Sequence, residues 1–342
     1  MGGDDAPGVV IDGAETARER YPEARFLLFG REAEIKPLLD NHPALARASE
    51  IIHTDDVVDA DDKPGHALRR RRNSSMAQAI AAVRDKSADV VVSAGNTGAL
   101  MALAKFTLRT LQDIDRPALA SLMPTYRGES VMLDLGANAE CSSDNLVEFA
   151  VMGAAFARTV LGLERPSVGL LNIGEEELKG NELVRDAAAI LRSSSLPLDF
   201  TGFLEGDKIG EGAVDVVVTD GFTGNIALKT AEGTAKLIAH LLEDAFRSAL
   251  SAKLGYLLAR QGLGGLKAHL DPNNHNGAVM LGLTGLVVKS HGGANATGLA
   301  TAIGVAVDMV RHDLIHLITE DLGGVAPEAE KGAASTGQAA LP

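Results

Sequence analysis

Short apolar runs alternate along the chain with longer segments in which apolar residues recur every three or four positions. The short runs end at Gly, Asn, Asp or Ser, which is typical of buried strands. We predict strands at Arg25–Phe29, Glu50–His53, Asp89–Val92, Ala118–Leu122, Ser130–Leu135, Ser167–Leu171, Leu198–Phe203, Val214–Val218 and Leu286–Lys289. The longer segments predict helices, the clearest at Ser74–Lys86, Asp144–Leu161 and Thr223–Phe246.

This alternation predicts an α/β fold, a three-layer α/β/α arrangement with helices on both faces of a largely parallel sheet. Ligands of such sheets bind beyond the carboxyl ends of the strands. Turns of small and polar residues follow five predicted strands, at Ser93–Gly98, Gly136–Cys141, Asn172–Asn181, Thr219–Asn225 and Lys289–Gly293. We expect these turns to share one edge of the sheet, where a ligand can approach the backbone closely.

The pattern predicts one domain over residues 1–320. The segment 323–342 is rich in Ala, Gly, Pro and Ser, and we predict that it is a disordered tail.

The turn after the third predicted strand is the strongest candidate for an anion site. This strand ends at Ser93, and an apolar helix opens near Ala99. Free N–H groups at a helix N-terminus attract anions, and the side chains of Ser93, Asn96 and Thr97 would add donors. Helix capping alone also favours these residue types, so the turn by itself leaves both interpretations open. Its glycines match neither a dinucleotide fingerprint nor a P-loop.

Composition excludes several classes of function. The chain has 342 residues, 4% of them aromatic, and a net charge of −14, which argues against a nucleic acid partner. The single cysteine, Cys141, permits no internal disulfide and is typical of the cytoplasm. The sequence shows no signal peptide, no apolar run long enough to span a membrane, and no histidines at metal-ligand spacing.

Two segments depart from the general pattern. Arg69–Arg72 is a dense basic run in an acidic chain, which indicates a negatively charged partner or a solvated helix end. The segment Leu250–Leu270 carries an apolar stripe, and glycines at 262–265 predict a break in its helix. We expect an inserted amphipathic hairpin with an apolar tip. The leucines of this hairpin would bind a bilayer surface weakly. The alternatives are that they pack in a dimer interface or in the core.

Several ordered motifs together resemble the bacterial phosphate acyltransferases of phospholipid synthesis, the PlsX family. The resemblance runs from Met1 to about Ile318. It rests on Met1–Asp4, Asn73–Met76, Ser93–Met101, Asp134–Asn138, Leu171–Gly180, Asp220–Asn225 and Lys289–Gly292. Each motif is weak alone, and their common order makes the resemblance specific.

The resemblance implies that inorganic phosphate attacks the thioester of a fatty acyl-acyl carrier protein, which yields acyl phosphate and needs no cofactor. It implies a homodimer with a fold like that of the isocitrate and isopropylmalate dehydrogenases. It also implies a cytoplasmic enzyme in peripheral contact with the membrane. There an integral glycerol-3-phosphate acyltransferase consumes the product.

Two departures from the family are visible. The family's first strand, which precedes Met-Gly-Gly-Asp, is absent, so we expect the natural chain to begin upstream of Met1. Glu140 stands where the family usually has Asp, which is tolerable if that carboxylate is structural.

The chemistry then suggests roles for individual residues. For phosphate binding we predict the amides and side chains of Gly2, Gly3, Ser93, Asn96, Thr97 and Asn138. For catalysis we predict Lys179 as the cation, Asn225 as a donor, and His291 as the acid that protonates the leaving thiolate. A solvated lysine and a capping or core histidine are the alternatives. Phosphate is itself a nucleophile, so Cys141 is expected to be a buried filler.

Further residues are assigned to partners. We predict that acyl carrier protein docks on Arg69, Arg70, Arg71 and Arg72, and that the membrane contacts Leu257, Leu258, Leu263 and Leu266. The acidic run Glu175–Glu177 would hold a divalent metal or, more simply, anchor Lys179 or arginines.

Three other functions compete with this interpretation. They are a phosphotransacylase that uses acyl-coenzyme A, a metal- and NAD-dependent dehydrogenase of the same fold, and a non-enzymatic scaffold for the carrier protein.

Overall fold

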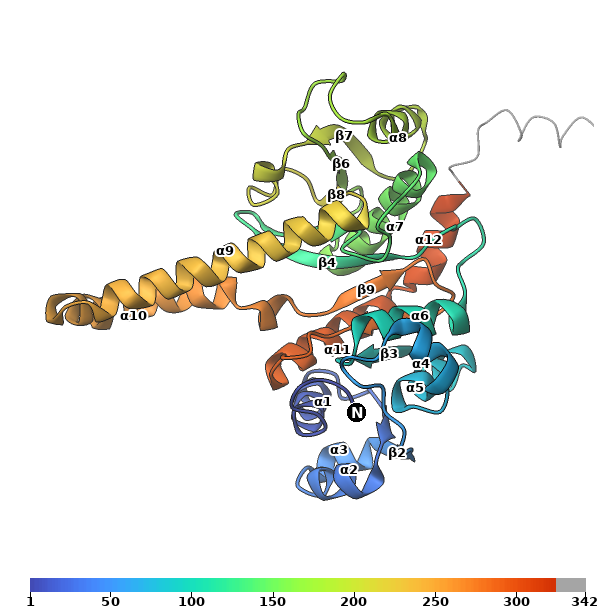
Figure 1. The fold of residues 1–342 in the computed structure, drawn as a ribbon, viewed down its shortest axis with the longest axis vertical. Helices are drawn as coiled ribbons and strands as arrows, with labels where there is room; N and C mark the ends of the chain where they lie inside the picture. The colour runs from blue at the N-terminus through green and yellow to red at the C-terminus, as the bar shows by residue number, and fades with distance from the viewer. Residues whose placement is uncertain (324–342) are drawn as a thin grey trace, which may run out of the picture.

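The computed structural model describes residues 1–323, without the side chains of residues 266–268 and 270. The predicted tail, apart from Gly323, therefore lies outside the described residues. A layered body carries one long projecting arm (Figure 1). The strands are β1 (Phe26–Gly30), β2 (Ser49–His53), β3 (Val90–Ser93), β4 (Ala118–Thr125), β5 (Gly128–Leu133), β6 (Ser167–Leu171), β7 (Asp199–Leu204), β8 (Val216–Val218), β9 (Ala278–Leu281) and β10 (Leu286–Lys289).

The helices include the three that the sequence predicts most clearly, which are α5, α7 and α9. Short 3₁₀ turns lie at Gly206–Lys208 and Pro272–His275. The α-helices are α1 (Gly8–Arg20), α2 (Glu32–Leu39), α3 (Pro43–Arg47), α4 (Pro64–Arg70), α5 (Ser75–Arg84), α6 (Thr97–Leu108), α7 (Ser143–Leu161), α8 (Glu182–Ser193), α9 (Gly221–Arg247), α10 (Leu250–Leu270), α11 (Ala296–Arg311) and α12 (Leu314–Leu322).

Eight strands form the central sheet, in the order β3-β10-β9-β4-β5-β8-β6-β7. The first two strands pair only with each other, in a separate parallel sheet. Every predicted strand is present, and β9 is an addition. It covers four residues between Gly277 and Gly282, which is too short a run to stand out in the sequence.

The central sheet contains a reversal of strand direction. Strand β9 runs antiparallel to both β10 and β4, and β4 runs antiparallel to β5. The remaining neighbours are parallel. Strands β3, β4 and β10 therefore point one way, and β5 to β9 point the other way.

This reversal corrects the expectation that all five ligand-binding turns share one edge. The turns after β3 and β10 lie at one edge of the sheet. Those after β5, β8 and β6 lie at the opposite edge. The candidate residues are consequently divided between two edges.

Each face of the sheet is covered by helices, which confirms the predicted three-layer α/β class. One apolar core joins the sheet to α7, α8, α11 and α12, with Phe149 and Phe156 fully buried at its centre. The other core joins the opposite face to α5 and α6 through Ile80 and Leu100. A smaller core around Ile11 and Leu45 holds α1 to α3 against β1.

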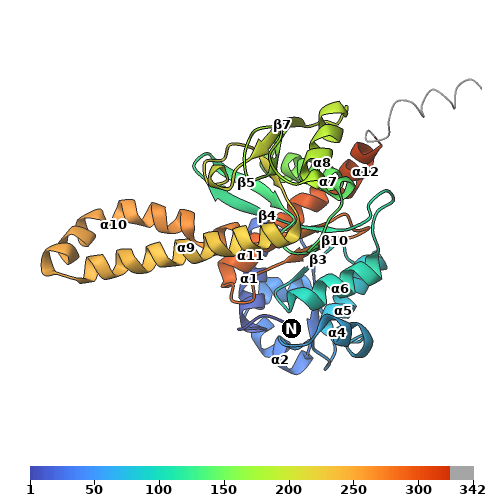
Figure 2. The same ribbon diagram turned by 45° about the horizontal axis from the view of Figure 1, so that its top comes forward.

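The arm consists of α9 and α10, which lie side by side in both views (Figure 1, Figure 2). The Asp220 side chain caps α9 by accepting a hydrogen bond from the Thr223 N–H. The predicted break at residues 262–265 is wrong, because α10 continues through its glycines to Leu270. The hairpin is formed by the two helices together.

The arm exposes much of its apolar surface. Leu257 is 60% and Leu258 is 81% exposed, and Leu263 is partly buried. The side chain of Leu266, also predicted to contact a membrane, is outside the described side chains. Within residues 1–323, no helix combines the length and apolar character that crossing a bilayer requires.

Candidate functional site

Three backbone segments meet at the edge formed by the ends of β3 and β10. We call this group the first cluster, defined as Gly2–Asp4, Ser93–Thr97 and Lys289–Gly293. The Asp4 N–H donates to the Gly292 carbonyl at 2.9 Å, and the Ser290 N–H donates to the Ser93 carbonyl at 2.9 Å.

Glycine is required where these segments touch. Gly2 and Gly3 have φ angles of +131° and +106°. A Cβ on Gly3 would lie 3.2 Å from the Gly292 carbonyl oxygen, and a Cβ on Gly2 would lie 3.1 Å from the Gly95 Cα. The absence of side chains at Gly2 and Gly3 lets the three segments pack closely, and their contact with phosphate stays a prediction.

The sequence analysis did not assign a role to Lys289, which enters the first cluster from the end of β10. Its partly buried ammonium donates to the carbonyl of Ala94 at 3.2 Å and to that of Ser290. Burial lowers the pKa of Lys289 to about 8, and the nearby Asp4 carboxylate opposes this shift. A lysine that ends a strand beside a Ser-His-Gly turn was the available sequence signal.

The other predicted phosphate residues of this edge differ in availability. Thr97 is exposed at the start of α6, and Ser93 accepts a hydrogen bond from the Gly95 N–H. Asn96 caps α6 through the Ala99 N–H. Its amide nitrogen donates to the carbonyls of a neighbouring loop, namely Asp59, Ala60 and Asp62. Asn96 therefore has a structural role, and any phosphate here would meet backbone N–H groups.

His291 lies in the first cluster and is exposed. Its Nδ1 atom accepts a hydrogen bond from the Gly293 N–H at 3.2 Å, which leaves Nε2 as the atom that can face a substrate. The acid role of His291 stays a prediction.

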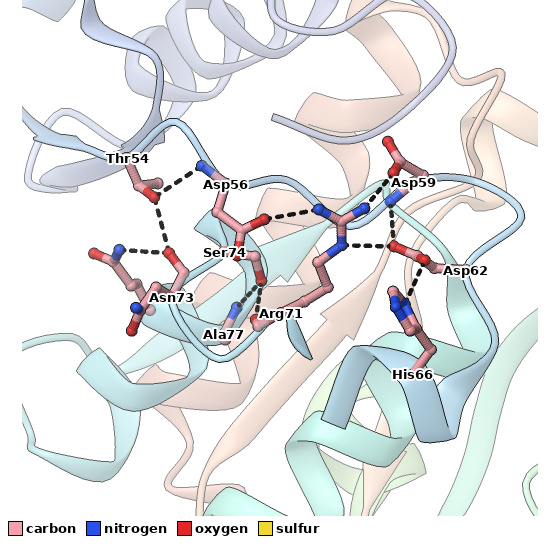
Figure 3. Close-up of polar contacts among 10 residues, drawn as sticks. Thr54, Asp56, Asp59, Asp62, His66, Arg71, Asn73, Ser74 and Ala77 are labelled. Carbon is pink, nitrogen blue, oxygen red and sulfur yellow. Dashed lines mark hydrogen bonds and ion pairs between the residues drawn. The ribbon is translucent and has the colours of Figure 1, made fainter. Parts of the chain in front are cut away.

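The predicted arginine patch divides into two parts. Arg69, Arg70 and Arg72 are exposed. Arg71 instead forms ion pairs with Asp56 at 3.0 Å, Asp59 at 2.5 Å and Asp62 at 3.0 Å (Figure 3). Those carboxylates raise the pKa of Arg71, led by the hydrogen bond to Asp56. Arg71 is committed to the loop of residues 55–63, so three arginines remain for a partner.

The second cluster lies at the opposite edge, and we define it as Asp134–Asn138 with Gly221–Asn225. The Asp134 carboxylate is fully buried. It accepts hydrogen bonds from the N–H groups of Leu119, Gly136, Ala137 and Asn138 and from the Asn138 side chain.

The predicted donors of the second cluster are already bonded within the chain. Asn138 is buried, and its amide nitrogen donates to Pro117 O as well as to Asp134. Asn225 is exposed and donates to the Leu135 carbonyl at 3.0 Å. Strand directions put both residues at the opposite end of the strands from the first cluster, and their contact with the same phosphate stays a prediction.

Lys179 occupies the same edge as the second cluster, in the loop after β6. Its side chain is exposed, and its stem covers Gly174, where a Cβ would lie 2.8 Å from Lys179 Cγ. Lys179 therefore does not share an edge with Ser93. In the acidic run, Glu177 pairs with Arg192 at 3.7 Å, as the arginine-anchor interpretation predicted. Residues 1–323 contain no metal-binding group of three or more His, Cys, Asp or Glu.

Helix α6 connects the two edges. It starts at Thr97 in the first cluster, and its residue Lys105 lines an open pocket beside the second cluster. Other residues of this pocket are Arg116, Asn138 and Glu140, and the Arg116 guanidinium donates to the Glu140 carbonyl.

Cys141 is unsuited to nucleophilic catalysis. Burial, followed by the charge of Asp134, raises the pKa of its thiol to about 11. This agrees with the filler role predicted for it.

Comparison with known proteins gives the chain a class. The phosphate acyltransferase of Rhodospirillum rubrum is 57% identical over 95% of this chain and 93% of its own length. That of Rhodospirillum centenum is 58% identical over 98% of this chain and 94% of its own length. A solved phosphotransacetylase from Streptococcus pyogenes has a TM-score of 0.57 at 18% identity, covering 88% of this chain and 91% of the other. The similarity to this structure shows the fold alone.

These relatives identify the chain as an acyltransferase enzyme. A family model described as "Fatty acid synthesis protein" matches residues 1–317. The chain belongs to this family, whose relatives here are phosphate acyltransferases.

Proposed function

We propose that the enzyme transfers a fatty acyl group from acyl-acyl carrier protein to inorganic phosphate, supplying acyl phosphate for phospholipid synthesis. The observation that carries this proposal is the first cluster. There glycine backbone, the N-terminus of α6 and the ammonium of Lys289 lie together, and groups of these kinds attract a small anion.

The reaction requires no covalent enzyme intermediate. A phosphate oxygen attacks the thioester carbonyl carbon, the C–S bond breaks, and the thiolate takes a proton. We assign that proton to His291, whose Nδ1 is bonded to the Gly293 N–H and whose Nε2 would be the donor. Backbone N–H groups near Gly2, Gly3 and Ser93 would hold the phosphate.

The opposite edge suits the acyl donor better than the phosphate. Exposed apolar side chains accompany Lys179 and Asn225 there, with Ile173 80% and Leu178 89% exposed. Phe222 and Ile226 are exposed in the first turns of α9. We assign this surface to the far end of the acyl chain, whose thioester end must extend to the first cluster, with Lys179 as a donor contact.

An assay of free thiol release tests the proposal. With acyl-acyl carrier protein as donor, release is expected to saturate as inorganic phosphate increases. Lys179→Ala is expected to raise the KM for the donor roughly 10-fold and to leave the KM for phosphate unchanged, as loss of one charged hydrogen bond would. The proposal fails if release is independent of phosphate. Equal kcat/KM with acyl-coenzyme A would favour the phosphotransacylase alternative.

We further propose that the enzyme is a cytoplasmic homodimer in peripheral contact with the membrane, where a glycerol-3-phosphate acyltransferase consumes the acyl phosphate. The exposed leucines of the arm support this proposal, because apolar patches of this kind mark interaction surfaces. Leu241 on α9 would face a second copy, and Leu257 and Leu258 on α10 would face lipid.

Two glutamate variants separate these contacts. Leu257→Glu is expected to abolish flotation with anionic phospholipid vesicles, since each buried leucine contributes about 1.5–3 kcal/mol. Leu241→Glu is expected to convert the dimer to a monomer in sedimentation equilibrium. Flotation of Leu257→Glu at the level of the unaltered chain would contradict the membrane contact. An unchanged mass for Leu241→Glu would contradict the dimer contact.

A further inference from the structure

We propose that Lys289 binds the phosphate substrate directly and supplies the positive charge of the first cluster. This inference rests on the proposed function and replaces Lys179 as the cation at the phosphate. The ligand of the site would be an inorganic oxyanion, held by the Lys289 ammonium and by backbone N–H groups.

The first argument is that the Lys289 ammonium is partly buried and has no ion-pair partner among the described residues. Its Nζ atom contacts two carbonyl oxygens, those of Ala94 and Ser290. None of the ion pairs found within residues 1–323 includes Lys289, and the Asp4 carboxylate acts on it only from beyond ion-pair distance. Buried charges in folded proteins are normally paired, so this ammonium is set up for a negative ligand.

The second argument is the space beside the ammonium. Lys289 contacts Ala94, and the turn that holds Ala94 is the turn against which Gly2 and Gly3 pack. Around Gly292 and Gly293 the nearest side-chain atoms belong to Asp4, at 3.4 Å and 3.2 Å from a Cβ placed on each glycine. Glycine backbone next to an ammonium that has no ion-pair partner is an arrangement that binds tetrahedral oxyanions, with Asp4 as the one side chain at these two glycines.

Two other lysines are poorer candidates for this role. Lys179 is exposed at the opposite edge of the sheet, and Lys105 is exposed beside the second cluster. Solvent screening weakens the attraction of an exposed lysine for an anion, and burial strengthens that of Lys289.

The Asp4 carboxylate limits the affinity. It lies beside Gly292 and Gly293, where it would repel a bound oxyanion. Removing the charge of Asp4 is therefore expected to tighten anion binding. If Asp4 instead stabilised the fold by pairing with Lys289, its removal would lower the stability of the protein.

The test uses Lys289→Met, which keeps the length of the side chain and removes the charge, and Lys289→Arg, which keeps the charge. Lys36→Met is the control, because Lys36 is exposed on α2 and pairs with Asp40. Sulfate is the first probe, since its charge does not change between pH 6 and 10. Its effect on the melting temperature is measured without any acyl donor.

We expect sulfate to raise the melting temperature of the unaltered chain and of Lys36→Met, and to have no effect on Lys289→Met. The stabilisation should decline as the pH rises through about 8, where Lys289 loses its proton. Asp4→Asn should show a larger rise than the unaltered chain. In sulfate-free buffer Lys289→Met is expected to melt no lower than the unaltered chain, because a buried unpaired charge is lost.

In the thiol-release assay, Lys289→Met is expected to raise the KM for phosphate roughly 10- to 100-fold, and Lys289→Arg is expected to raise it less. Equal sulfate stabilisation and equal phosphate KM in Lys289→Met and Lys36→Met would overturn the inference. If the unaltered chain shows no phosphate-dependent release, the proposed function fails. The sulfate measurement then still decides whether Lys289 binds an oxyanion.

Discussion

Replacing Asp134 with Ala is expected to destabilise the fold by about 3–5 kcal/mol, the largest loss among the substitutions considered. The buried carboxylate satisfies four backbone N–H groups and the Asn138 side chain. Each donor left unsatisfied inside the protein costs about 1–3 kcal/mol, and water entering the vacated space recovers part of this. The turn after β5 and the start of α9 would loosen together, because the Gly221 N–H is bonded to Asn138 O.

Urea unfolding followed by circular dichroism measures this loss. Asp134→Asn is expected to lose less, because Oδ1 keeps its acceptor role while the new amide opposes the donors near Asn138. Asp186→Ala, at an exposed position of α8, is the control and should change stability by less than about 0.5 kcal/mol. A loss for Asp134→Ala no larger than that of Asp186→Ala would contradict the role of the buried network.

Replacing Arg71 with Met is expected to release the loop of residues 55–63 and to impair phosphate use. Three carboxylates that now share Arg71 would repel one another. The same loop accepts three hydrogen bonds from Asn96, the cap of α6 (Figure 3 shows the Arg71 contacts). Its release would therefore disturb the helix start at the first cluster.

Limited proteolysis and the phosphate KM report this change. Cleavage within residues 55–63 is expected to be roughly 10-fold faster in Arg71→Met, because local opening governs the cleavage rate. Combined replacement of Arg69, Arg70 and Arg72 by Glu is the contrast. It should leave cleavage unchanged and raise the KM for acyl carrier protein but not for acyl-coenzyme A. Equal cleavage in the two variants would contradict the distinction drawn for Arg71.

The Arg71 contacts also predict a dependence on pH. A hydrogen bond from the Asp59 N–H, with contributions from Arg71 and His66, lowers the pKa of Asp62 below its ordinary value. The stabilisation is therefore complete above the pKa of a free aspartate, about 4, and is lost as the pH falls through the lower folded value. Protease resistance of residues 55–63 should be constant from pH 7 to about 5 and then decline.

The local pattern of the sequence predicted the strands and the main helices, because the spacing of apolar residues within a segment is enough to indicate a strand or a helix. It did not predict the direction of the strands. The connection at residues 126–127 decides whether β5 runs parallel or antiparallel to β4. The apolar pattern of a strand does not indicate its direction in the sheet. The expectation of a single ligand-binding edge failed for this reason.

Side-chain partners were also beyond the sequence pattern. Arg71 looks like its neighbours Arg69 and Arg70, and only the folded loop brings Asp56, Asp59 and Asp62 to it. Lys289 was visible as a lysine after a strand, but its burial depends on segments almost 200 and 300 residues away, at Ala94 and Asp4. The glycines of α10 predicted a break, but the helix continues through them, because a glycine in a helix costs only about 1 kcal/mol.

The reversal of strand direction at β9 and β4 has a kinetic consequence. Under the proposed assignment, phosphate binds at one end of α6 and the acyl donor approaches from the other end, so neither must depart before the thioester reaches the phosphate. Such an enzyme forms a ternary complex by either order of addition, and its double-reciprocal plots intersect instead of running parallel.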